Sequence, residues 1–426
     1  MKKFFALLLA LVMVLSMVAC SQQAAQPEAE ETPAAPAQSE APAESQAPVT
    51  EAPADNSAVK IGVILVHDEN SGYDMAHIEG VWAARDALGL TDEQIIFKYN
   101  IPEDEKCYDT AVDLAEQGCS IIFSDSYGHQ SYMMQAAEEY PEVFFVACTG
   151  DLAAGTGLGN VANIFPYTYE SRYVSGVVAG MKLKELMDAG TVTDPYVGYV
   201  GAYPYAEVVS GYTAFFLGIR SIVPEAHMDV QYTNSWYDPT AEAEAANALM
   251  AKGCVIIGQH ADSTGAPMAV QAAQDSGKVV YSVGYNIDML SVAKTAALTS
   301  AQNNWGVLYT ATLDKFLKGE AIPVDFATGY KDDAVMISTL GESCAAGTAE
   351  KVEEVIAAIK DGSLNIFDTA NFTVGGETVT TYMALDTDGD FVGDTGEAIV
   401  DGIFQESSLR SAPYFGLRID GITELN

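Results

Sequence analysis

Two stretches of the sequence repeat one another at a nearly constant spacing. Residues 118–150, GCSIIFSDSYGHQSYMMQAAEEYPEVFFVACTG, correspond to residues 253–285, GCVIIGQHADSTGAPMAVQAAQDSGKVVYSVGY, and their Gly-Cys and Ile-Ile pairs match at an offset of 135 residues. Further upstream, KIGVILV (60–66) corresponds to YVGYVGA (196–202). Elements that recur in the same order at nearly one offset indicate two copies of one supersecondary unit. The duplication therefore predicts two similar lobes.

Each copy alternates short apolar strands with amphipathic helices, which is typical of a doubly wound parallel sheet. We expect strands near 60–66, 94–100, 119–125, 143–149 and 160–165 in the first lobe, and near 196–202, 228–235, 254–260, 278–284 and 296–301 in the second. The predicted fold class is α/β, with two doubly wound parallel-sheet lobes and a cleft between them. Ligands bind at the carboxyl ends of parallel strands and at domain junctions, so this cleft is the expected site.

The chain is expected to cross between the lobes more than once. We assign residues 58–164 and about 291–322 to lobe 1, and residues 165–290 and about 323–426 to lobe 2. The segment 366–385 carries Gly375-Gly376 between β-rich runs, which predicts a hairpin appended to lobe 2.

The first residues, MKKFFALLLALVMVLSMVAC, have the positive start, apolar run and small residues of a secretion signal. Their ending resembles a bacterial lipobox, in which Cys20 is lipidated after removal of a signal peptide over 1–19. The alternative is an ordinary signal peptide cut nearby. Residues 20–57 are rich in Pro, Ala and Glu and lack large apolar side chains, so we expect a disordered tether. Acyl chains on Cys20 would hold the protein at the outer face of the cell membrane.

The formal charge of −39 excludes several classes of partner. Such a charge repels nucleic acid and acidic lipid, so we expect contact with the membrane through the lipid anchor only. The cysteines form no CxxC pair, which argues against a zinc or redox motif. The run DTDGDFVGDTGE (386–397) resembles a calcium loop, but Phe391 stands where such a loop needs glycine. We therefore expect no cofactor and no bound metal.

The stretch VIIGQHADSTGAP (255–267) turns from a buried strand into a polar cluster. Its position at the carboxyl end of a strand favours ligand binding by Asp262. The alternative is that Asp262, Ser263 or Thr264 caps the helix that follows, since these residue types are common N-caps.

Several motifs in this order resemble one known family. They are YTNSWYDP (232–239), GQHADS (258–263), GYNIDM (284–289) and NNWG (303–306), together with GYDMAH (72–77) and YVGAYPYAEVVSG (199–211). With the lipobox and the duplicated lobes, the chain resembles solute-binding lipoproteins of the basic-membrane-protein type, which are similar to purine nucleoside receptors of ABC importers. The resemblance covers most of residues 58–320 and is greatest for a branch associated with adenine or related purines. In that branch Trp usually stands at the position of Tyr73.

The resemblance implies a type I periplasmic binding protein-like fold, a purine-like solute, and ABC permease and ATPase partners for a monomeric receptor. Strand ends are expected to bring candidate ligand-binding residues to the cleft: Tyr73, Ser124, Tyr203, Trp236, Asp262 and Asp288, with Asn304 beside them. Tyr73 and Trp236 can stack on the two faces of a heteroaromatic ring. The carboxylates of Asp262 and Asp288 can accept hydrogen bonds from its N–H groups or from ribose hydroxyls, and Asn304 can donate and accept.

Each of these assignments has a structural alternative. Trp236 can be a core residue where a strand meets a loop, and Asp288 can cap a helix that starts at Met289. His260 is expected to be a structural hydrogen-bonding residue, and His77 is expected to face the second helix.

Three functional classes compete. The first is the purine receptor of an importer, and the second is the same scaffold binding a sugar or another small polar solute, or acting as a ligand-sensing lipoprotein. The third is a hydrolase, but no Walker A, HExxH or GxSxG motif is present, and SVAK (291–294) lacks the companion motifs of SxxK enzymes. We therefore expect a binding protein and no enzyme.

The lipobox assignment predicts that Cys20 anchors the protein. A Cys20→Ser variant should lose covalent lipid and leave the membrane fraction, unless its uncleaved first segment holds it there. The measurement is mass spectrometry of the mature N-terminal peptide, and a wild-type peptide without acyl groups would show the assignment to be wrong.

Overall fold

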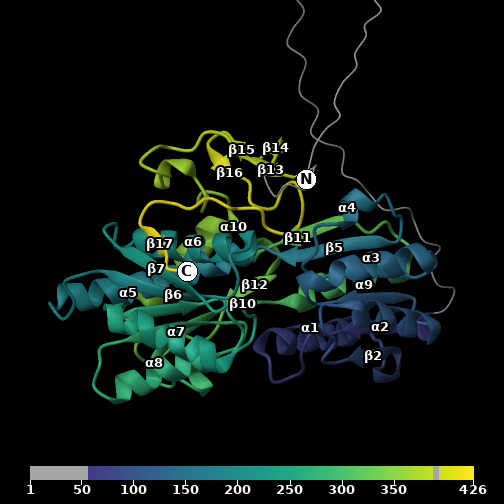
Figure 1. Ribbon diagram of the computed structural model, residues 1–426, viewed down its shortest axis with the longest axis horizontal. Coiled ribbons are helices and arrows are strands. Elements are labelled where there is room, and N and C mark those ends of the chain that lie inside the picture. Colours follow the sequence, from purple (N-terminus) through teal and green to yellow (C-terminus); the bar gives the residue numbers. More distant parts are fainter. Residues whose placement is uncertain (1–55, 387–392) are drawn as a thin grey trace, which may run out of the picture. The chain divides into compact units, whose positions relative to one another are not determined.

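The computed structural model describes residues 56–386 and 393–426 (Figure 1). The signal peptide, Cys20 and the tether up to residue 55 lie outside the described residues, as do residues 387–392 of the acidic run. Among the helices of the described residues, none has the length and apolar character that crossing a bilayer requires.

The first lobe is built on a six-stranded sheet in the order β11-β5-β4-β3-β1-β2. All of its neighbouring strands are parallel. The strands are β1 (Ile61–Ile64), β2 (Ile95–Lys98), β3 (Ile121–Ser124), β4 (Phe144–Ala147), β5 (Val161–Pro166) and β11 (Asp325–Thr328). Its helices are α1 (Gly72–Leu88), α2 (Glu105–Glu116), α3 (Gln130–Glu139), α4 (Ala153–Thr156) and α9 (Trp305–Lys318). Helix α1 packs against α9, and α2 packs against α3.

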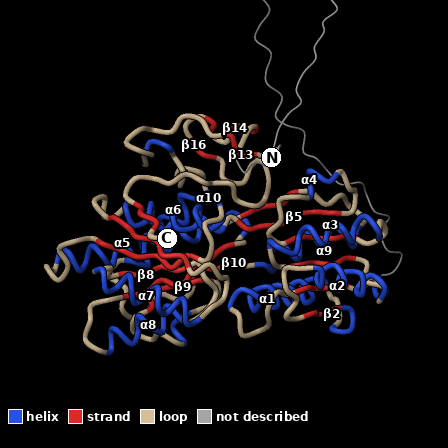
Figure 2. The backbone as a smooth tube through the Cα atoms, viewed as in Figure 1, coloured by secondary structure: helices blue, strands red, loops and turns tan. Residues whose placement is uncertain are grey.

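The second lobe is built on a seven-stranded sheet in the order β12-β10-β9-β8-β6-β7-β17. It is parallel except for β12, which runs antiparallel to β10. The strands are β6 (Tyr196–Gly201), β7 (His227–Tyr232), β8 (Ile256–Gln259), β9 (Tyr281–Tyr285), β10 (Ala297–Asn303), β12 (Val335–Ile337) and β17 (Ile422–Glu424). The helices are α5 (Thr168–Asp188), α6 (Ala206–Arg220), α7 (Pro239–Lys252), α8 (Gly265–Asp275) and α10 (Thr348–Lys360). Figure 2 shows the strands of each lobe running between helices.

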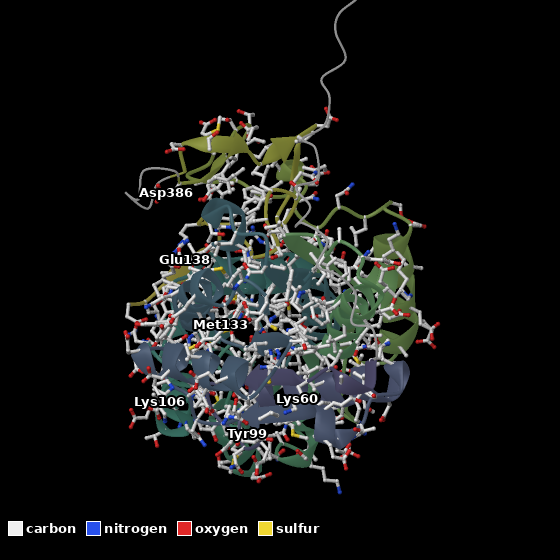
Figure 3. All side chains as sticks on the ribbon, turned by 90° about the vertical axis from the view of Figure 1, so that its right-hand side faces the viewer. Lys60, Tyr99, Lys106, Met133, Glu138 and Asp386 are labelled. Carbon is white, nitrogen blue, oxygen red and sulfur yellow. The ribbon has the colours of Figure 1, made fainter. Side chains whose placement is uncertain are left out.

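Burial follows the expected pattern within these layers. The strands of the first sheet are mostly buried along their whole length, which explains why they read as continuous apolar runs in the sequence. Helix α3 is amphipathic: Met133 is fully buried whereas Glu138 is exposed (Figure 3). Helices α5 and α6 are instead buried over most of their surface. The predicted fold class of two doubly wound parallel-sheet lobes is confirmed.

The exchange of segments between the lobes differs in detail from the expected boundaries. Strand β10 pairs with β9 in the second sheet, as expected for the strand near 296–301, although the boundary at about 291 assigned these residues to lobe 1. Strand β11 pairs with β5 in the first sheet, although residues from about 323 were assigned to lobe 2. The chain therefore crosses between the lobes after β5, between β10 and α9, and between β11 and β12. These edge strands are placed by pairing with strands distant in sequence, which a local pattern does not reveal.

The C-terminal region adds small antiparallel units to the second lobe. Val374 and Glu377 form an isolated antiparallel bridge around Gly375 and Gly376, whose φ angles are 60° and 85°, so a tight turn lies where the hairpin was expected. The longer hairpin expected over 366–385 does not form, because the runs on either side of the turn make no further ladder with each other. Strand β13 (Met383–Leu385) pairs with β14 (Thr395–Glu397), and β15 (Ile399–Val400) pairs with β16 (Ile403–Phe404). The chain then returns as β17 to the edge of the second sheet.

Helices α5 and α6 approach one another at backbone distance through two glycines. A Cβ atom on Gly176 of α5 would lie 2.0 Å from the carbonyl oxygen of Phe215, and one on Gly218 of α6 would lie 2.2 Å from that of Tyr173. Because α5 also carries Arg172 toward the ends of the second sheet, this contact sets the depth at which Arg172 lies.

We predict that Gly176→Ala destabilises the protein, because backbone cannot yield to the added methyl group. The clash should cost about 2 kcal/mol or more, which exceeds the helix propensity that alanine gains. The matched control is Gly155→Ala in α4, where a Cβ meets nothing within 4 Å. Denaturant unfolding measures both variants, and equal stabilities would contradict the close approach of α5 and α6.

Candidate ligand-binding pocket

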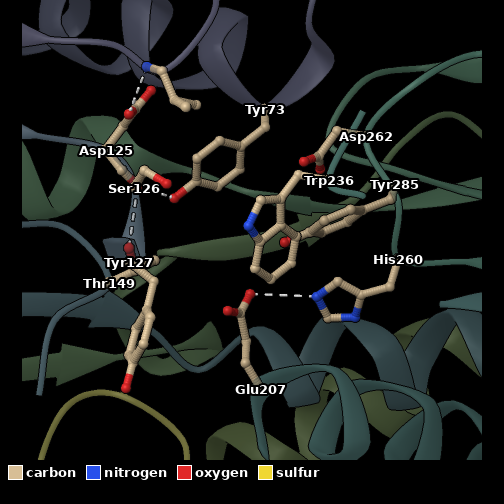
Figure 4. A pocket seen from close by; sticks show the side chains of 11 residues that line it. Tyr73, Asp125, Ser126, Tyr127, Thr149, Glu207, Trp236, His260, Asp262 and Tyr285 are labelled. Atoms are coloured by element: carbon tan, nitrogen blue, oxygen red, sulfur yellow. Dashed lines mark hydrogen bonds and ion pairs between the residues drawn. The ribbon is translucent and has the colours of Figure 1, made fainter. Parts of the chain in front are cut away.

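The carboxyl ends of strands from both lobes surround one pocket (Figure 4). The lining residues from the first lobe are Val66, Tyr73, Asp125, Ser126, Tyr127 and Thr149, and those from the second lobe are Glu207, Trp236, His260, Asp262 and Tyr285. The pocket holds about 380 Å³ of empty space including its mouth. Side chains of both lobes face this space, so the two lobes lie close together here.

Tyr73 is held rigidly on the first turn of α1. Ser71 caps this helix by accepting a hydrogen bond from the backbone N–H of Asp74. The Tyr73 hydroxyl donates to the backbone carbonyl of Asp125 over 2.6 Å, and its ring lies edge-on to His77 with the centroids 4.6 Å apart. Because both ends of the side chain are fixed, Tyr73 presents a pre-positioned aromatic ring from the first lobe.

Trp236 presents the corresponding indole from the second lobe, in the loop between β7 and α7. Its ring centroid lies 5.1 Å from that of Tyr203 and 6.0 Å from that of Tyr205. Its backbone carbonyl accepts a hydrogen bond of 2.8 Å from the N–H of Asp262. This backbone hydrogen bond joins the loop of Trp236 to the loop of Asp262, so that an aromatic ring and a carboxyl group lie near each other at the pocket.

Asp125, directly after β3, is the buried carboxyl group of the first lobe. Its Oδ1 accepts a 3.0 Å hydrogen bond from the N–H of Val66, and its Oδ2 has no partner among the described residues. Burial, together with the nearby charge of Asp74, raises the pKa of Asp125 well above its usual value. For Asp74, burial opposes ionisation, but hydrogen bonds from His67 and Ser71 outweigh it and lower the pKa. Asp125 is therefore the member of the pair that keeps its proton to the higher pH.

Asp262 is the buried carboxyl group of the second lobe. Its Oδ1 accepts a 2.8 Å hydrogen bond from the side-chain amide of Asn286. Burial, followed by the charge of Glu242, raises the pKa of Asp262 well above its usual value. The backbone N–H of Gly265, where α8 begins, is bonded by the Ser263 hydroxyl over 3.0 Å. The Asp262 side chain thus lines the pocket and does not cap α8, whose N-cap residue is Thr264.

His260 and Glu207 form the opposite wall of the pocket, with Arg172 behind them. His260 Nε2 lies 3.3 Å from Glu207 Oε1. Burial and then the charge of Arg172 lower the pKa of His260 to about 4, so the imidazole is neutral at pH 7. Arg172 donates to the carbonyl of Gln259 over 2.6 Å, and its guanidinium lies 3.6 Å from the ring centroid of Tyr285. This cation supports the wall from behind and is not among the lining residues.

The structure brings Tyr73, Trp236 and Asp262 together in the pocket, as expected for ligand-binding residues. Tyr203 lies next to Trp236 and lines an adjoining surface hollow with His67.

The other expected site residues do not line this pocket. Ser124 is fully buried at the end of β3, with a hydroxyl that has no partner among the described residues. Asp288 accepts from the N–H of Leu290 over 2.9 Å, which is the capping role considered as its alternative. Asn304 donates to the carbonyl of Asp333 over 3.0 Å at the start of α9.

His77 differs from its expected position facing the second helix. It contacts α9, stacked on Trp305 with the ring centroids 3.9 Å apart and hydrogen-bonded to the Tyr309 hydroxyl. The reason is that α1 packs against α9, which returns to the first lobe from far along the chain.

Sequence reasoning missed four pocket residues for which a signal was present. Asp125 directly follows Ser124, Glu207 lies within the YVGAYPYAEVVSG motif, and His260 precedes Asp262 by two positions. Tyr285 ends the repeat of the second lobe. For Asp125, Glu207 and Tyr285 the right segment was identified but another residue of it was chosen, because the direction of a side chain beyond a strand end depends on the turn. His260 was expected to be structural, although its neighbour Asp262 was correctly placed at the pocket.

Two parallel-sheet lobes with a pocket at their facing strand ends define a periplasmic binding protein-like solute receptor. A family model described as "ABC transporter substrate-binding protein PnrA-like" matches residues 59–366. The chain belongs to this family, whose members bind small solutes for ABC importers with permease and ATPase subunits and are not enzymes.

Relatives and solved structures agree with this assignment. A purine-binding protein of Brucella abortus (strain 2308) is 31% identical over 310 residues, covering 72% of this chain and 83% of its own. A Haloferax volcanii protein, provisionally assigned as an ABC transporter glucose-binding protein, is 33% identical over 251 residues, which is 59% of each chain. A solute-binding protein structure from Aeropyrum pernix K1 has a TM-score of 0.59 at 16% identity, and covers 75% of this chain and 94% of its own. One from Conexibacter woesei has a TM-score of 0.58 at 19% identity, with 72% and 98% covered. These two structures support the fold alone.

We predict that stability depends on pH through Glu242, which lies buried behind Asp262. Burial raises the pKa of Glu242 to about 7. A carboxyl whose pKa is raised by folding stabilises the folded state at low pH, and this contribution is lost as the pH rises through 7. The free energy of unfolding should therefore fall between pH 5 and pH 8, and less steeply in Glu242→Gln. Glu244→Gln, exposed on the same helix, is the control for denaturant titrations at each pH. Parallel profiles for wild type and Glu242→Gln would contradict the prediction.

Proposed function

We propose that the pocket binds an uncharged purine base or nucleoside for import. The observation that carries this proposal is the pairing of a rigid aromatic ring from each lobe, Tyr73 and Trp236, with a buried carboxyl group from each lobe, Asp125 and Asp262. Offset stacking on aromatic faces favours a flat heteroaromatic ring. Carboxyl groups at the same pocket suit the mixed donors and acceptors at the edge of a purine.

The electrostatics of the lining support an uncharged solute. Asp125, Glu207 and Asp262 are acidic, whereas no lysine or arginine is among the pocket-lining residues that the structure describes. A buried phosphate or carboxylate on the ligand would lose its hydration among acidic side chains without a compensating cation, which is strongly unfavourable. Carboxyl oxygens at the pocket can accept hydrogen bonds from a ligand that carries N–H or O–H groups. The purine-binding relative from Brucella abortus supports the same ligand class.

A sugar is the second candidate, because the relative from Haloferax volcanii is assigned, provisionally, to glucose. Aromatic rings and carboxylates also suit pyranose rings and their hydroxyls. Material released by denaturing the purified protein distinguishes the two, since a purine absorbs near 260 nm and a sugar does not. In either case we propose a monomer anchored through Cys20 at the extracytoplasmic face, with residues 20–57 as the tether.

The role of Asp262 predicts a loss of affinity without a loss of fold. Asp262→Ala should weaken adenine or adenosine binding by about 1.5–3 kcal/mol, or roughly 10- to 150-fold, because a hydrogen bond to a charged or strongly polarised group is lost. Trp236→Ala should cost a similar amount through lost stacking. Isothermal titration calorimetry measures both, with Asp275→Ala at the far end of α8 as the control.

The alternative roles give a different result. If Asp262 served only the local structure, the variant would melt at a lower temperature while its affinity, measured well below melting, stayed unchanged. An unchanged affinity in a folded Asp262→Ala protein would overturn the binding role.

A further inference from the structure

One segment that begins and ends in the second lobe reaches the first lobe in its middle. Residues 405–414, which we call the C-terminal strap, follow β16. Phe404, directly before the strap, and Tyr414, its last residue, are both buried in the core of the second lobe. The strap lies beyond residue 366, where the match to the family model ends. In Figure 1 the C-terminal part of the chain, in yellow, runs from the second lobe to the neighbourhood of β11.

The strap makes charged and polar contacts with two carboxylates of the first lobe. Arg410 Nη1 lies 3.1 Å from Asp151 Oδ2, and the two side chains are only 23% and 12% exposed. The backbone N–H and the hydroxyl of Ser411 both donate to Asp325 Oδ1, each over 2.9 Å. Asp151 follows β4 and Asp325 begins β11, so both acceptors belong to the first lobe.

The two ends of the strap are fixed to the second lobe. Glu406 is 3% exposed and accepts a hydrogen bond from Ser210 on α6. The Tyr414 hydroxyl donates to the backbone carbonyl of Gln405, which closes the strap into a loop. Since the base is fixed to one lobe and the tip to the other, the contacts of Arg410 and Ser411 resist separation of the lobes.

The tip of the strap also reaches a residue of the pocket. Asp151 Oδ2 accepts a hydrogen bond of 3.1 Å from the hydroxyl of Tyr127. Tyr127 lines the pocket, and its ring centroid lies 6.1 Å from that of Tyr205 in the second lobe. Figure 4 shows its hydroxyl directed away from the other pocket side chains and toward a ribbon in the colour of the C-terminal region. The Arg410–Asp151 pair therefore fixes the acceptor that orients Tyr127.

We propose that the C-terminal strap is a latch that holds the two lobes closed and positions Tyr127 at the pocket through Asp151. Contacts made only in the closed arrangement shift the equilibrium between open and closed forms by their own free energy. Arg410 is then a positioning residue that slows the opening of the pocket. The effect on a bound ligand rests on the proposed function, whereas the effect on lobe separation does not.

The test of lobe separation measures a distance in the protein without ligand. Spin labels are placed at Glu138→Cys on α3 and Lys278→Cys after α8, in a full chain with Cys20→Ser and Cys344→Ser, since the other native cysteines are buried. Pulsed electron–electron double resonance should give a longer and broader distance distribution for Arg410→Gln than for its parent. The matched control is Arg418→Gln, whose partner Glu424 lies 2.9 Å away within the second lobe. If Arg410→Gln does not fold, Asp151→Asn removes the same ion pair by changing its other partner.

The test of the pocket uses adenosine as the probe. Release of adenosine, followed by stopped-flow tryptophan fluorescence, should be about three- to tenfold faster in Arg410→Gln and unchanged in Arg418→Gln. A distance distribution for folded Arg410→Gln and Asp151→Asn equal to that of the parent would overturn the latch. A longer distance with an unchanged release rate would overturn the link to the pocket. If adenosine does not bind the wild type, the proposed function fails, and the distances alone still decide the latch.

Discussion

The burial of carboxyl groups at the facing ends of the two sheets is the constraint on which the pocket depends. Burial raises the pKa values of Asp125 and Asp262, and among the described residues no lysine or arginine forms an ion pair with either carboxyl group. Each accepts a hydrogen bond from a neutral donor: the N–H of Val66 in one case and the amide of Asn286 in the other. Burying a carboxyl oxygen that accepts no hydrogen bond costs free energy, and a donor group on a ligand can offset this cost. These buried carboxyl groups therefore favour a ligand with N–H or O–H groups and without negative charge.

The surrounding scaffold keeps these groups in place. Arg172 reaches the end of β8 from α5 and packs over Tyr285, so that a single buried guanidinium supports the wall formed by His260 and Tyr285. The depth of α5 in turn depends on Gly176, where α6 passes at backbone distance. On the other lobe, Tyr73 is fixed by its hydrogen bond to Asp125. Both lobes thus present rigid groups, and closure of the lobes brings the two sets together. Because these groups need little further ordering when a ligand binds, the entropy cost of binding is lowered.

Much of this could be predicted from the sequence, because the duplicated apolar runs determine parallel strands that pack locally. The strand expected near 254–260 is β8, and the cluster after it does lie at the pocket. The sheet assignment of β11 could not be predicted, since it depends on pairing at an edge with a strand distant in sequence. Asp288 has the residue type and position of a ligand-binding group, but its carboxylate accepts a hydrogen bond from the backbone N–H of Leu290. Asp125 was missed because the turn after a strand, and not the alternation of side chains along the strand, decides which way the next side chain points.

We propose that the acidic pocket takes an uncharged purine compound. Calorimetric titration of the wild-type protein with adenosine and with adenosine 5′-monophosphate, which differ only by the phosphate group, tests this proposal. We expect the monophosphate to bind at least about 100-fold more weakly than the nucleoside, because no lysine or arginine among the described lining residues can pair with its charge. Equal affinities for the two compounds, or tighter binding of the monophosphate, would contradict it.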